Sequence, residues 1–573
     1  MLIKSVIQAI PTYTMGCFKI PMGLCNEIEA MIIKFWWGQR GNRRKIHWMK
    51  WDELTKSKDV GGMGFRDLAK FNDSLLAKQA WHLLHNQNSL FYKVSKARLF
   101  PNSTIMEAKE SRMGSYAWRS ILVGRDVIQR GARWRVGDGK KIRIWQDNWL
   151  PRKHPSLALS CPLTNFENAT VDILIDPRSR QWNVDMVDGL FNIEEAKIIK
   201  SIPLSQVAIE DILFWPYSYD GRYSCKTGYR FLKEEEELNV VSGEVTNEDK
   251  QFWRKIWCMK VPPKVRNLLS RACRDTIPTK SAMFRCKISL DPLCVRCQAS
   301  TETPLHALWS CSKLDSMWSN TMLWSNRGSV QFMDFKELLL WQIKNKNQLE
   351  LFAITAWTIW NQRNQIRVNQ PADALHQLAH LSKVWLDDYH GRLIIPDTQV
   401  QQVRRSENRW RPPPSEFYKI NFDDAVFPFE KKTGVGVMIR DHRGQVIASC
   451  SKLVHQQLYS NEIEALVASC ALSFALEVGV KRAILEGDSL SVIKGLMEEE
   501  RMLVPLGLLI EDAKRLSHNF DELSYSHTKR ECNALAHNLA RYAISIPDFL
   551  VWMEEVPSQF QNVLQADSIG LFQ

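Results

Sequence analysis

Alternating hydrophobic and polar positions near the C-terminus predict an α/β domain. Tyr418, Ile420 and Phe422 share one face of an expected strand, and Lys419, Asn421 and Asp423 share the other. Apolar segments at 434–439 and 446–448 flank the turn residues 441–444, which predicts a hairpin. Another strand is expected over 483–488. The patterns follow one another as strand, strand, strand, helix, strand, helix, strand, helix, which gives five strands.

The first helix of this domain shows apolar residues at helical spacing. Its stripe consists of Ile463, Val467, Cys470 and Phe474. Ser460-Asn461 can cap the start of the helix, and Gly479 can end it. Glu464 therefore falls in the first turn of the expected helix.

The rest of the chain shows mainly helical patterns. Residues 1–100 predict helices over 27–37 and 68–84, and another helical region is expected over 333–390. Gly137-Asp138-Gly139 lies between two alternating runs and predicts a hairpin. The acidic stretch 234–250 predicts a linker. Arginines and three consecutive prolines between 404 and 414 predict a second linker, which is basic and stiff.

Length and charge restrict the kind of protein. A chain of 573 residues is too long for one core, and its net charge of +13 favours an acidic partner, for which nucleic acid is the default. An inert basic surface is the alternative. The odd number of cysteines, 13, indicates a reducing compartment. We find no signal peptide and no membrane-spanning stretch, so we expect an intracellular protein, nuclear or cytoplasmic, that is not secreted.

A cysteine–histidine cluster predicts a metal site. Cys294, Cys297, His306 and Cys311 lie within 18 residues and follow the pattern C-x2-C-x8-H-x4-C. Three thiolates and one imidazole suit tetrahedral Zn²⁺, and four protein ligands indicate a structural ion. With Trp253, Trp257 and the Val261–Val265 segment, the region resembles the reverse-transcriptase zinc-binding domain over about 220–320.

Three carboxylates predict a second metal site. Asp423 and Asp488 each end a predicted strand, and Glu464 begins the predicted helix. Hard cations such as Mg²⁺ take oxygen ligands, and a pair of them can clamp the attacking and leaving oxygens of a phosphodiester. The sequence therefore predicts that Asp423, Glu464 and Asp488 hold Mg²⁺ or Mn²⁺.

The same region resembles type 1 ribonuclease H, in the form found at the end of plant LINE-type (non-LTR) retroelements, over about 415–545. The resemblance implies a mixed five-stranded sheet and carries the family's histidine and Arg-Glu-x-Asn pattern onto His527 and residues 530–533. It places His537 where the family has a fourth catalytic acid, and Asp424 where the family has glycine. We expect Asp424 to lie on the face opposite Asp423, and His527 to carry protons. An ordinary strand-end histidine is the alternative for His527.

The N-terminal region resembles the segment that follows the polymerase core of plant LINE-type reverse transcriptases. The matching residues are Phe35–Gly38, Gly61–Asp67 and Lys78–Trp81, and no Tyr-x-Asp-Asp polymerase motif is present. We expect the polymerase core to lie upstream of Met1. The expected domains are a helical thumb or connection remnant (1–150), a connecting region (151–219), the zinc-binding domain (220–320), helices with the basic linker (321–414), the ribonuclease H domain (415–545) and a tail (546–573).

These features support three functional hypotheses. The leading one is a nucleic-acid-binding hydrolase that cuts the RNA strand of RNA–DNA hybrids. The second is an inactive nucleic-acid-binding relic or co-opted protein, which Asp424 and His537 favour. The third is a scaffold that binds a polymerase partner in trans. The sequence leaves open whether the chain is an enzyme.

Overall fold

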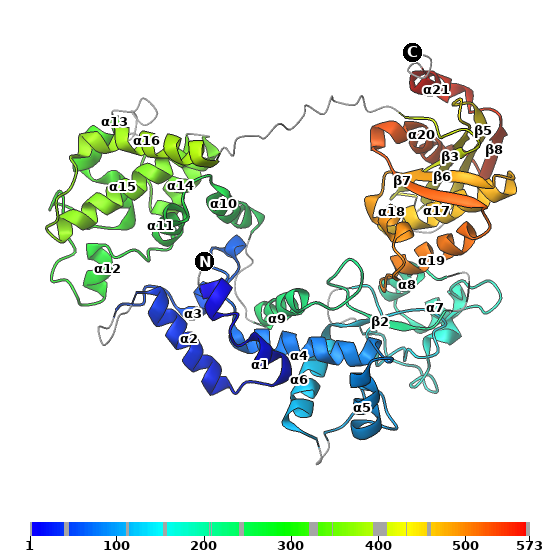
Figure 1. Cartoon of the computed structure of the whole chain (residues 1–573), viewed down its shortest axis with the longest axis horizontal. Helices are drawn as coiled ribbons and strands as arrows, with labels where there is room; N and C mark the ends of the chain where they lie inside the picture. Colours follow the sequence, from blue (N-terminus) through cyan, green and yellow to red (C-terminus); the bar gives the residue numbers. More distant parts are fainter. Residues whose placement is uncertain are drawn as a thin grey trace. The chain divides into compact units, whose positions relative to one another are not determined.

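The computed structural model describes most of the 573-residue chain. Its description excludes residues 1–2, 39–44, 111–113, 153–156, 206, 208, 240–245, 320–329, 346–347, 394–409, 431, 455–459 and 569–573, together with the side chains of residues 5, 239, 319, 393, 460, 461 and 568. The chain divides into two compact units (Figure 1): residues 1–72 with 235–402, and residues 73–234 with 403–573. Among the described residues, no helix has both the length and the apolar character needed to cross a membrane.

The N-terminal region is helical, as predicted. Its helices are α1 (Thr12–Cys17), α2 (Met22–Trp36), α3 (Trp51–Thr55) and α4 (Leu68–His85). A small core forms around Ile32, Leu54 and Phe65, with the Trp36 and Phe65 rings in a T-shaped arrangement. The glycine-rich stretch after α3 is a loop in which Gly61 and Gly64 both have positive φ, a conformation that glycine adopts without a steric penalty.

The zinc-binding region and the following helices share one hydrophobic core in the first unit. The helices are α10 (Asn247–Cys258), α11 (Pro263–Cys273), α12 (Lys280–Arg285), α14 (Phe335–Lys344), α15 (Leu349–Arg367) and α16 (Leu375–Leu393). Cys294 and Cys311 belong to this core together with Phe352 and Ile359 of α15. The helices expected over 333–390 therefore support the cysteine–histidine cluster rather than standing apart from it.

The second unit begins with α5 (Leu90–Leu99), α6 (Tyr116–Gly131), α7 (Val184–Leu190), α8 (Ile193–Lys200) and α9 (Cys225–Asn239). The acidic residues 234–237 lie in the last turns of α9, so the predicted linker does not begin there. Residues 240–245 lie outside the described residues. The basic linker residues 404–409 also lie outside them.

The hairpin predicted at 137–139 is wrong. Strand β1 (Arg133–Arg135) pairs instead with the distant β2 (Ile212–Phe214) in antiparallel fashion. The reason is Asp211, which precedes β2 and whose carboxylate accepts hydrogen bonds from the backbone N–H groups of Gly137, Gly139 and Lys141 at 2.7–2.9 Å. The turn is therefore closed by a side chain from elsewhere in the sequence, which brings β2 to β1.

The C-terminal domain contains a mixed sheet of six strands in the order β7-β6-β3-β4-β5-β8. The strands are β3 (Tyr418–Phe427), β4 (Lys432–Arg440), β5 (Val446–Val454), β6 (Arg482–Gly487), β7 (Glu522–His527) and β8 (Phe549–Met553). Pairs β3–β4, β4–β5 and β5–β8 are antiparallel, and β3–β6 and β6–β7 are parallel. The five predicted strands are confirmed, and β8 is an additional edge strand within the predicted tail.

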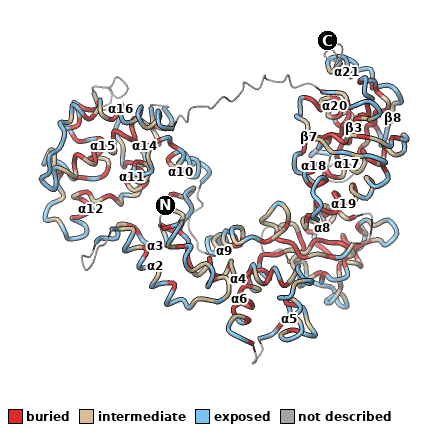
Figure 2. The backbone as a smooth tube through the Cα atoms, in the orientation of Figure 1, coloured by how far each residue is buried: buried red, intermediate tan, exposed pale blue. Residues whose placement is uncertain are grey.

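Helices cover both faces of this sheet (Figure 1). One face, which includes Ile420, Phe422 and Val437, is covered by three helices: α17 (Ser460–Glu477), α18 (Leu490–Met497) and α19 (Leu506–Ser517). Helix α20 (Ala534–Tyr542) and helix α21 (Gln561–Ser568) pack on the other face, around Met438. Strands β3 and β4 are consequently buried along most of their length (Figure 2). Two helices, α18 and α19, replace the single helix expected between β6 and β7.

Candidate functional site

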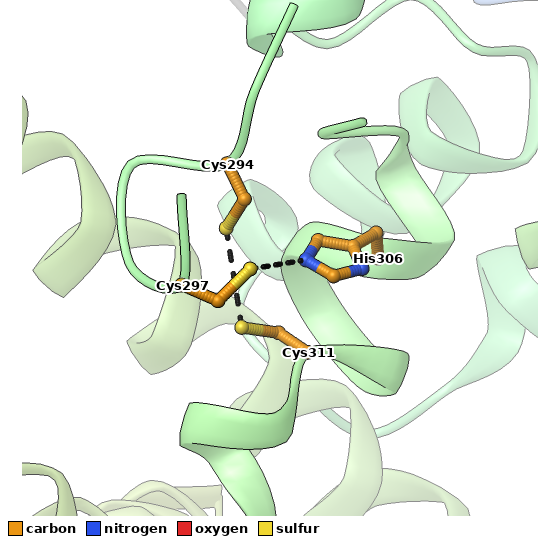
Figure 3. A group of neighbouring side chains, drawn as sticks. All are labelled: Cys294, Cys297, His306 and Cys311. Atoms are coloured by element: carbon orange, nitrogen blue, oxygen red, sulfur yellow. Dashed lines mark hydrogen bonds between the residues drawn. The ribbon is translucent and has the colours of Figure 1, made fainter. Parts of the chain in front are cut away.

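The four predicted zinc ligands come together in the first unit (Figure 3). Cys294 and Cys297 lie on the loop after α12, His306 begins the short helix η4 (His306–Ser310), and Cys311 follows that helix. Cys294 Sγ lies 3.9 Å from Cys311 Sγ, and Cys297 Sγ lies 3.3 Å from His306 Nε2. All four ligand atoms lie within 4.8 Å of one another, a spacing that one tetrahedral ion can bridge.

The chemistry of these donors also fits zinc. The hydrogen bond from the Cys311 thiol lowers the pKa of Cys294 to about 3, which favours the thiolate that metal binding requires. The contact with Cys294 raises the pKa of His306. Zinc binding would displace the protons that these groups share, and the ion would hold the loop to η4. The zinc-binding assignment is therefore supported by sequence pattern, geometry and donor type.

Buried polar contacts fix the zinc loop to α15. The guanidinium of Arg296, between the first two cysteines, donates to the carbonyl of Ile359 and to Gln362 Oε1, each at 2.7 Å. Glu302, in the same loop, forms an ion pair with Arg363, and both side chains are fully buried. Sequence reasoning did not identify this pair, because Glu302 and Arg363 are 61 residues apart.

The structure brings the predicted acids toward the C-terminal end of β6. Asp423 lies on β3 opposite Gly436 of β4, and Asp488 directly follows the last residue of β6. Glu464 lies in the second turn of α17, which packs on β3. The parallel pairing of β3 with β6 sets the middle of β3 beside the end of β6, because Asn421 is the partner of Glu486. The prediction that Asp423 ends its strand is wrong, since β3 continues to Phe427.

Burial and mutual repulsion dominate the electrostatics of these acids. Burial, followed by the charge of Asp488, raises the pKa of Asp423 to about 8. Burial also raises the pKa of Glu464; a hydrogen bond with the Ser489 side chain opposes this rise, and the charge of Asp488 adds to it. The Oε2 atom of Glu464 is buried without a hydrogen-bond partner in the described part of the chain. Crowded carboxylates with an unpaired buried oxygen match the oxygen-ligand chemistry of a divalent cation, so the residues fit such an ion.

Asp424 is also part of this group of acids. It lies on the face opposite Asp423, as predicted from strand alternation, but that face is the one covered by α17. Burial raises the pKa of Asp424 to about 7, with further contributions from the charges of Glu464 and then Asp488. The sequence showed Asp424 as a departure from the family pattern, but only the packing of α17 shows which groups it faces.

The two predicted histidines both lie at the site. His537, on α20, places Nδ1 at 3.1 Å from Oδ2 of Asp423. Burial lowers the pKa of His537, and the charges of Arg530 and Arg541 lower it further. The exposed His527, at the end of β7, places Nε2 at 3.1 Å from the backbone oxygen of Asp488.

Gly436 explains why α20 can approach the sheet so closely. A Cβ added at Gly436 would lie 2.0 Å from the backbone oxygen of Ala536, which immediately precedes His537. Since Gly436 is also the antiparallel partner of Asp423, the missing side chain lets α20 bring His537 to Asp423.

A buried polar network lies beside Asp423 on the same face of β3. Asn421 donates to Glu486 at 3.0 Å and to Asn533 at 3.3 Å, and Asn533 donates to the carbonyl of Phe422 at 2.8 Å. Trp410 Nε1 donates to Asn421 Oδ1 at 2.9 Å, and the Arg440 guanidinium lies 3.6 Å from the centre of the Trp410 ring. Sequence reasoning missed this network; the polar face of β3 was the available signal.

The sheet order and the acid group define a ribonuclease H-like domain, and the first unit adds a zinc-binding domain. Comparison with known families agrees. The model described as "Reverse transcriptase-like" matches residues 421–543, and the model described as "zinc-binding in reverse transcriptase" matches residues 223–318. The chain belongs to the reverse-transcriptase-derived family that combines these two domains.

Two Arabidopsis thaliana proteins are similar to the chain. One, named as a candidate ribonuclease H protein, is 26% identical over 598 residues, which cover 99% of this chain and 92% of the relative. The other, an uncharacterized mitochondrial protein, is 42% identical over 149 residues, which cover 26% of this chain and 97% of the relative.

Solved ribonuclease H structures resemble part of the chain. The RNase H1 of the archaeon Halobacterium salinarum is 25% identical and covers 22% of this chain and 98% of its own, with a TM-score of 0.21. LC11-RNase H1, solved in complex with an RNA/DNA hybrid, is 19% identical and covers 22% of this chain and 96% of its own, also with a TM-score of 0.21. The fold assignment rests on the strand order and the family models.

Proposed function

We propose that the C-terminal domain hydrolyses the RNA strand of RNA–DNA hybrids. The observation that carries this proposal is the group formed by Asp423, Glu464 and Asp488 beside the C-terminal end of β6, with a buried unpaired Oε2 atom on Glu464. A bound Mg²⁺ or Mn²⁺ would activate a water molecule and neutralise charge on the phosphodiester. The family models and the named relatives support the same activity.

The side chains of this chain have separate roles in the proposed reaction. Asp423, Glu464 and Asp488 would hold the cation. Asn533 anchors the start of α20 through its bond to the carbonyl of Phe422, which keeps His537 at Asp423. His527 is exposed beside Asp488 and is placed to exchange protons with solvent.

The net charge of +13 supports nucleic acid as the partner, and the 2′-hydroxyl would distinguish the RNA strand. We assign the zinc-binding domain a structural ion, because all four positions are protein ligands. We propose an intracellular location in the nucleus or cytoplasm, because the odd number of cysteines, 13, favours a reducing compartment. A polymerase partner in trans stays a prediction.

A specific observation favours the second candidate, a nucleic-acid-binding protein without catalysis. His537 occupies the position of the fourth acid, and neutral imidazole is a poorer Mg²⁺ ligand than a carboxylate. This binding role requires the basic charge of the chain but not the cation.

A cleavage assay with labelled substrate separates the two. The full-length chain is incubated with RNA–DNA hybrid, duplex RNA and duplex DNA, in Mg²⁺ and in Mn²⁺, beside the Asp488→Asn variant. We expect the wild type to cut the RNA of the hybrid alone and the variant to lose most of this activity. If both proteins cut only at the background level in both metals, the hydrolase proposal is contradicted. The nucleic-acid-binding protein without catalysis then remains as the candidate.

A further inference from the structure

Three helices of the first unit, α11, α15 and α16, bring two tryptophans and a lysine together (Figure 1). Lys264 lies in the first turn of α11, Trp357 on α15 and Trp385 on α16. The centroids of the two indole rings lie 5.2 Å apart, with 34° between the ring planes. The Lys264 ammonium lies 4.0 Å from the Trp357 centroid and 5.1 Å from the Trp385 centroid. These three residues are called the Trp–Lys cluster.

One ring of the Trp–Lys cluster is buried on the inside, and the other is open to solvent. Trp357 packs against the hydrophobic core of the first unit, which fixes the position of the cluster. Trp385 is 47% exposed, and its neighbour Val384 is 46% exposed. A single exposed apolar side chain needs no explanation, but here the exposed indole lies beside a second indole and a cation. The cluster therefore offers an aromatic surface and a positive charge at the same place.

The positive charge of the Trp–Lys cluster is available to a ligand. Lys264 is exposed and has no carboxylate partner among the described residues. Of the two acids that follow Trp385 on α16, Asp388 forms an ion pair with Arg392 at 3.0 Å. The other, Asp387, is two positions from Trp385, so it lies on roughly the opposite side of the helix.

A second exposed lysine lies where the segment before α11 meets α16. His390 Nε2, on α16, lies 2.9 Å from the backbone oxygen of Lys260, which places Lys260 against the same helix as Trp385. Anionic groups of a ligand on this surface would therefore meet two lysines. The combination of cations with an exposed aromatic ring suits a strand whose phosphates are charged and whose bases are flat and unpaired.

We propose that the Trp–Lys cluster binds single-stranded nucleic acid: a base stacks on the exposed indole of Trp385, and Lys260 and Lys264 contact the adjoining phosphates. This inference rests on the nucleic-acid partner of the proposed function but not on hydrolysis. Base pairing covers the faces of the bases in a duplex, so stacking on Trp385 selects the single strand. Under the opposing hypotheses, the indole contacts a protein partner or has no ligand.

Binding to strands with and without bases tests the inference. The fluorescence anisotropy of labelled oligothymidylate is compared with that of an abasic strand of equal length, with the full-length, zinc-loaded chain in buffer without Mg²⁺ or Mn²⁺. We expect Trp385→Ala to weaken binding of oligothymidylate by roughly 5- to 150-fold, the effect of losing one stacked base. Binding of the abasic strand and of duplex DNA should stay unchanged, and Trp385→Phe should keep most of the affinity for oligothymidylate. The matched control is Tyr219→Ala, which removes an exposed aromatic ring from the second unit and should have no effect.

The lysine is tested by salt dependence. Lys264→Gln should reduce the slope of log affinity against log salt concentration by about 0.7, equally for oligothymidylate and the abasic strand, because it removes one phosphate contact. The control Lys140→Gln, which removes an exposed lysine of the second unit, should have a smaller effect.

Trp385→Ala that binds oligothymidylate as tightly as the wild type, or loses affinity equally for the abasic strand, overturns the inference. Photo-crosslinking of a strand containing 5-iodouracil to the wild type needs no variant. Mass spectrometry should locate the crosslink at Trp385, and crosslinks only at other residues overturn the inference as well. The hydrolase fails separately: a chain that binds the single strand through Trp385 but never cuts the hybrid refutes hydrolysis and leaves this inference intact.

Discussion

The buried ion pair of Glu302 and Arg363 connects the zinc loop to α15, and Glu302→Gln should weaken zinc binding strongly. Arg363 Nε donates to Glu302 Oε1 at 3.0 Å, Arg363 Nη2 donates to Oε2, and the backbone N–H of Lys280 donates to the same Oε2 at 2.7 Å. Glutamine keeps only one acceptor oxygen, so its amide would face an N–H donor. The guanidinium would also lose its counter-charge.

The expected cost follows from the full burial of both side chains. Removing one partner of a buried ion pair costs about 3–5 kcal/mol. Glu302 lies between Cys297 and His306, so ordering of the loop and binding of the ion occur together. At about 1.4 kcal/mol per tenfold change, the variant should bind zinc some two to four orders of magnitude more weakly.

The measurement is a competitive zinc titration of the full-length chain against a chromophoric chelator. Zinc affinity is the better readout, because a chain with several cores does not unfold in one step. The matched control is Asp275→Asn, which breaks the exposed pair with Arg285 in the same domain and should change the affinity little. Zinc affinity of Glu302→Gln within threefold of the wild type refutes the reasoning. The double variant Glu302→Leu, Arg363→Met should recover much of the loss, because it leaves no buried charge unpaired.

Two further predictions concern the metal sites. Cys294→Ser should reduce bound zinc from one ion per chain to none by elemental analysis, since it removes one of four ligands; retained zinc contradicts the assignment. The second prediction applies to Mg²⁺-free buffer. Burial raises the pKa of Asp424 to about 7 in the folded protein, so protonation of this carboxyl stabilises the folded state. This contribution to folding stability is lost as the pH rises through 7. Between pH 6 and 8.5, the opening free energy of β3 and α17 from hydrogen exchange should fall by about 1–2 kcal/mol more in the wild type than in Asp424→Asn. A difference between the two proteins that does not vary with pH contradicts this account.

Local sequence patterns predicted much of the C-terminal domain. Alternation on β3 and the apolar stripe of α17 come from contacts with one sheet face, so they are visible as period-two and helical repeats. The additional strand β8 was not predicted, because it lies at the edge of the sheet and its side chains are mostly exposed. The hairpin at 137–139 was wrong for a different reason. Its turn is held by Asp211, more than seventy residues away.

In the candidate site too, local spacing predicted some features, whereas contacts between distant segments were not predicted. The spacing of the cysteines and His306 indicated the zinc site, because ligands of one small loop are close in sequence. The anchoring of that loop by Arg363 was not visible, since the partners come from distant segments. Likewise, the polar face of β3 was predicted, but its contacts with Trp410 and Asn533 depend on chain segments that pack around the sheet.

By itself, the sequence determined the order of strands and helices around Asp423, Glu464 and Asp488, and the four-ligand zinc pattern, because both are encoded by local spacing. Only the tertiary structure decided which groups each acid of β3 faces. Asp423 meets His537 because Gly436 admits α20, and Asp424 faces Glu464 because α17 covers the opposite face. These relations depend on the packing of helices on a sheet, which joins residues that are far apart in the chain.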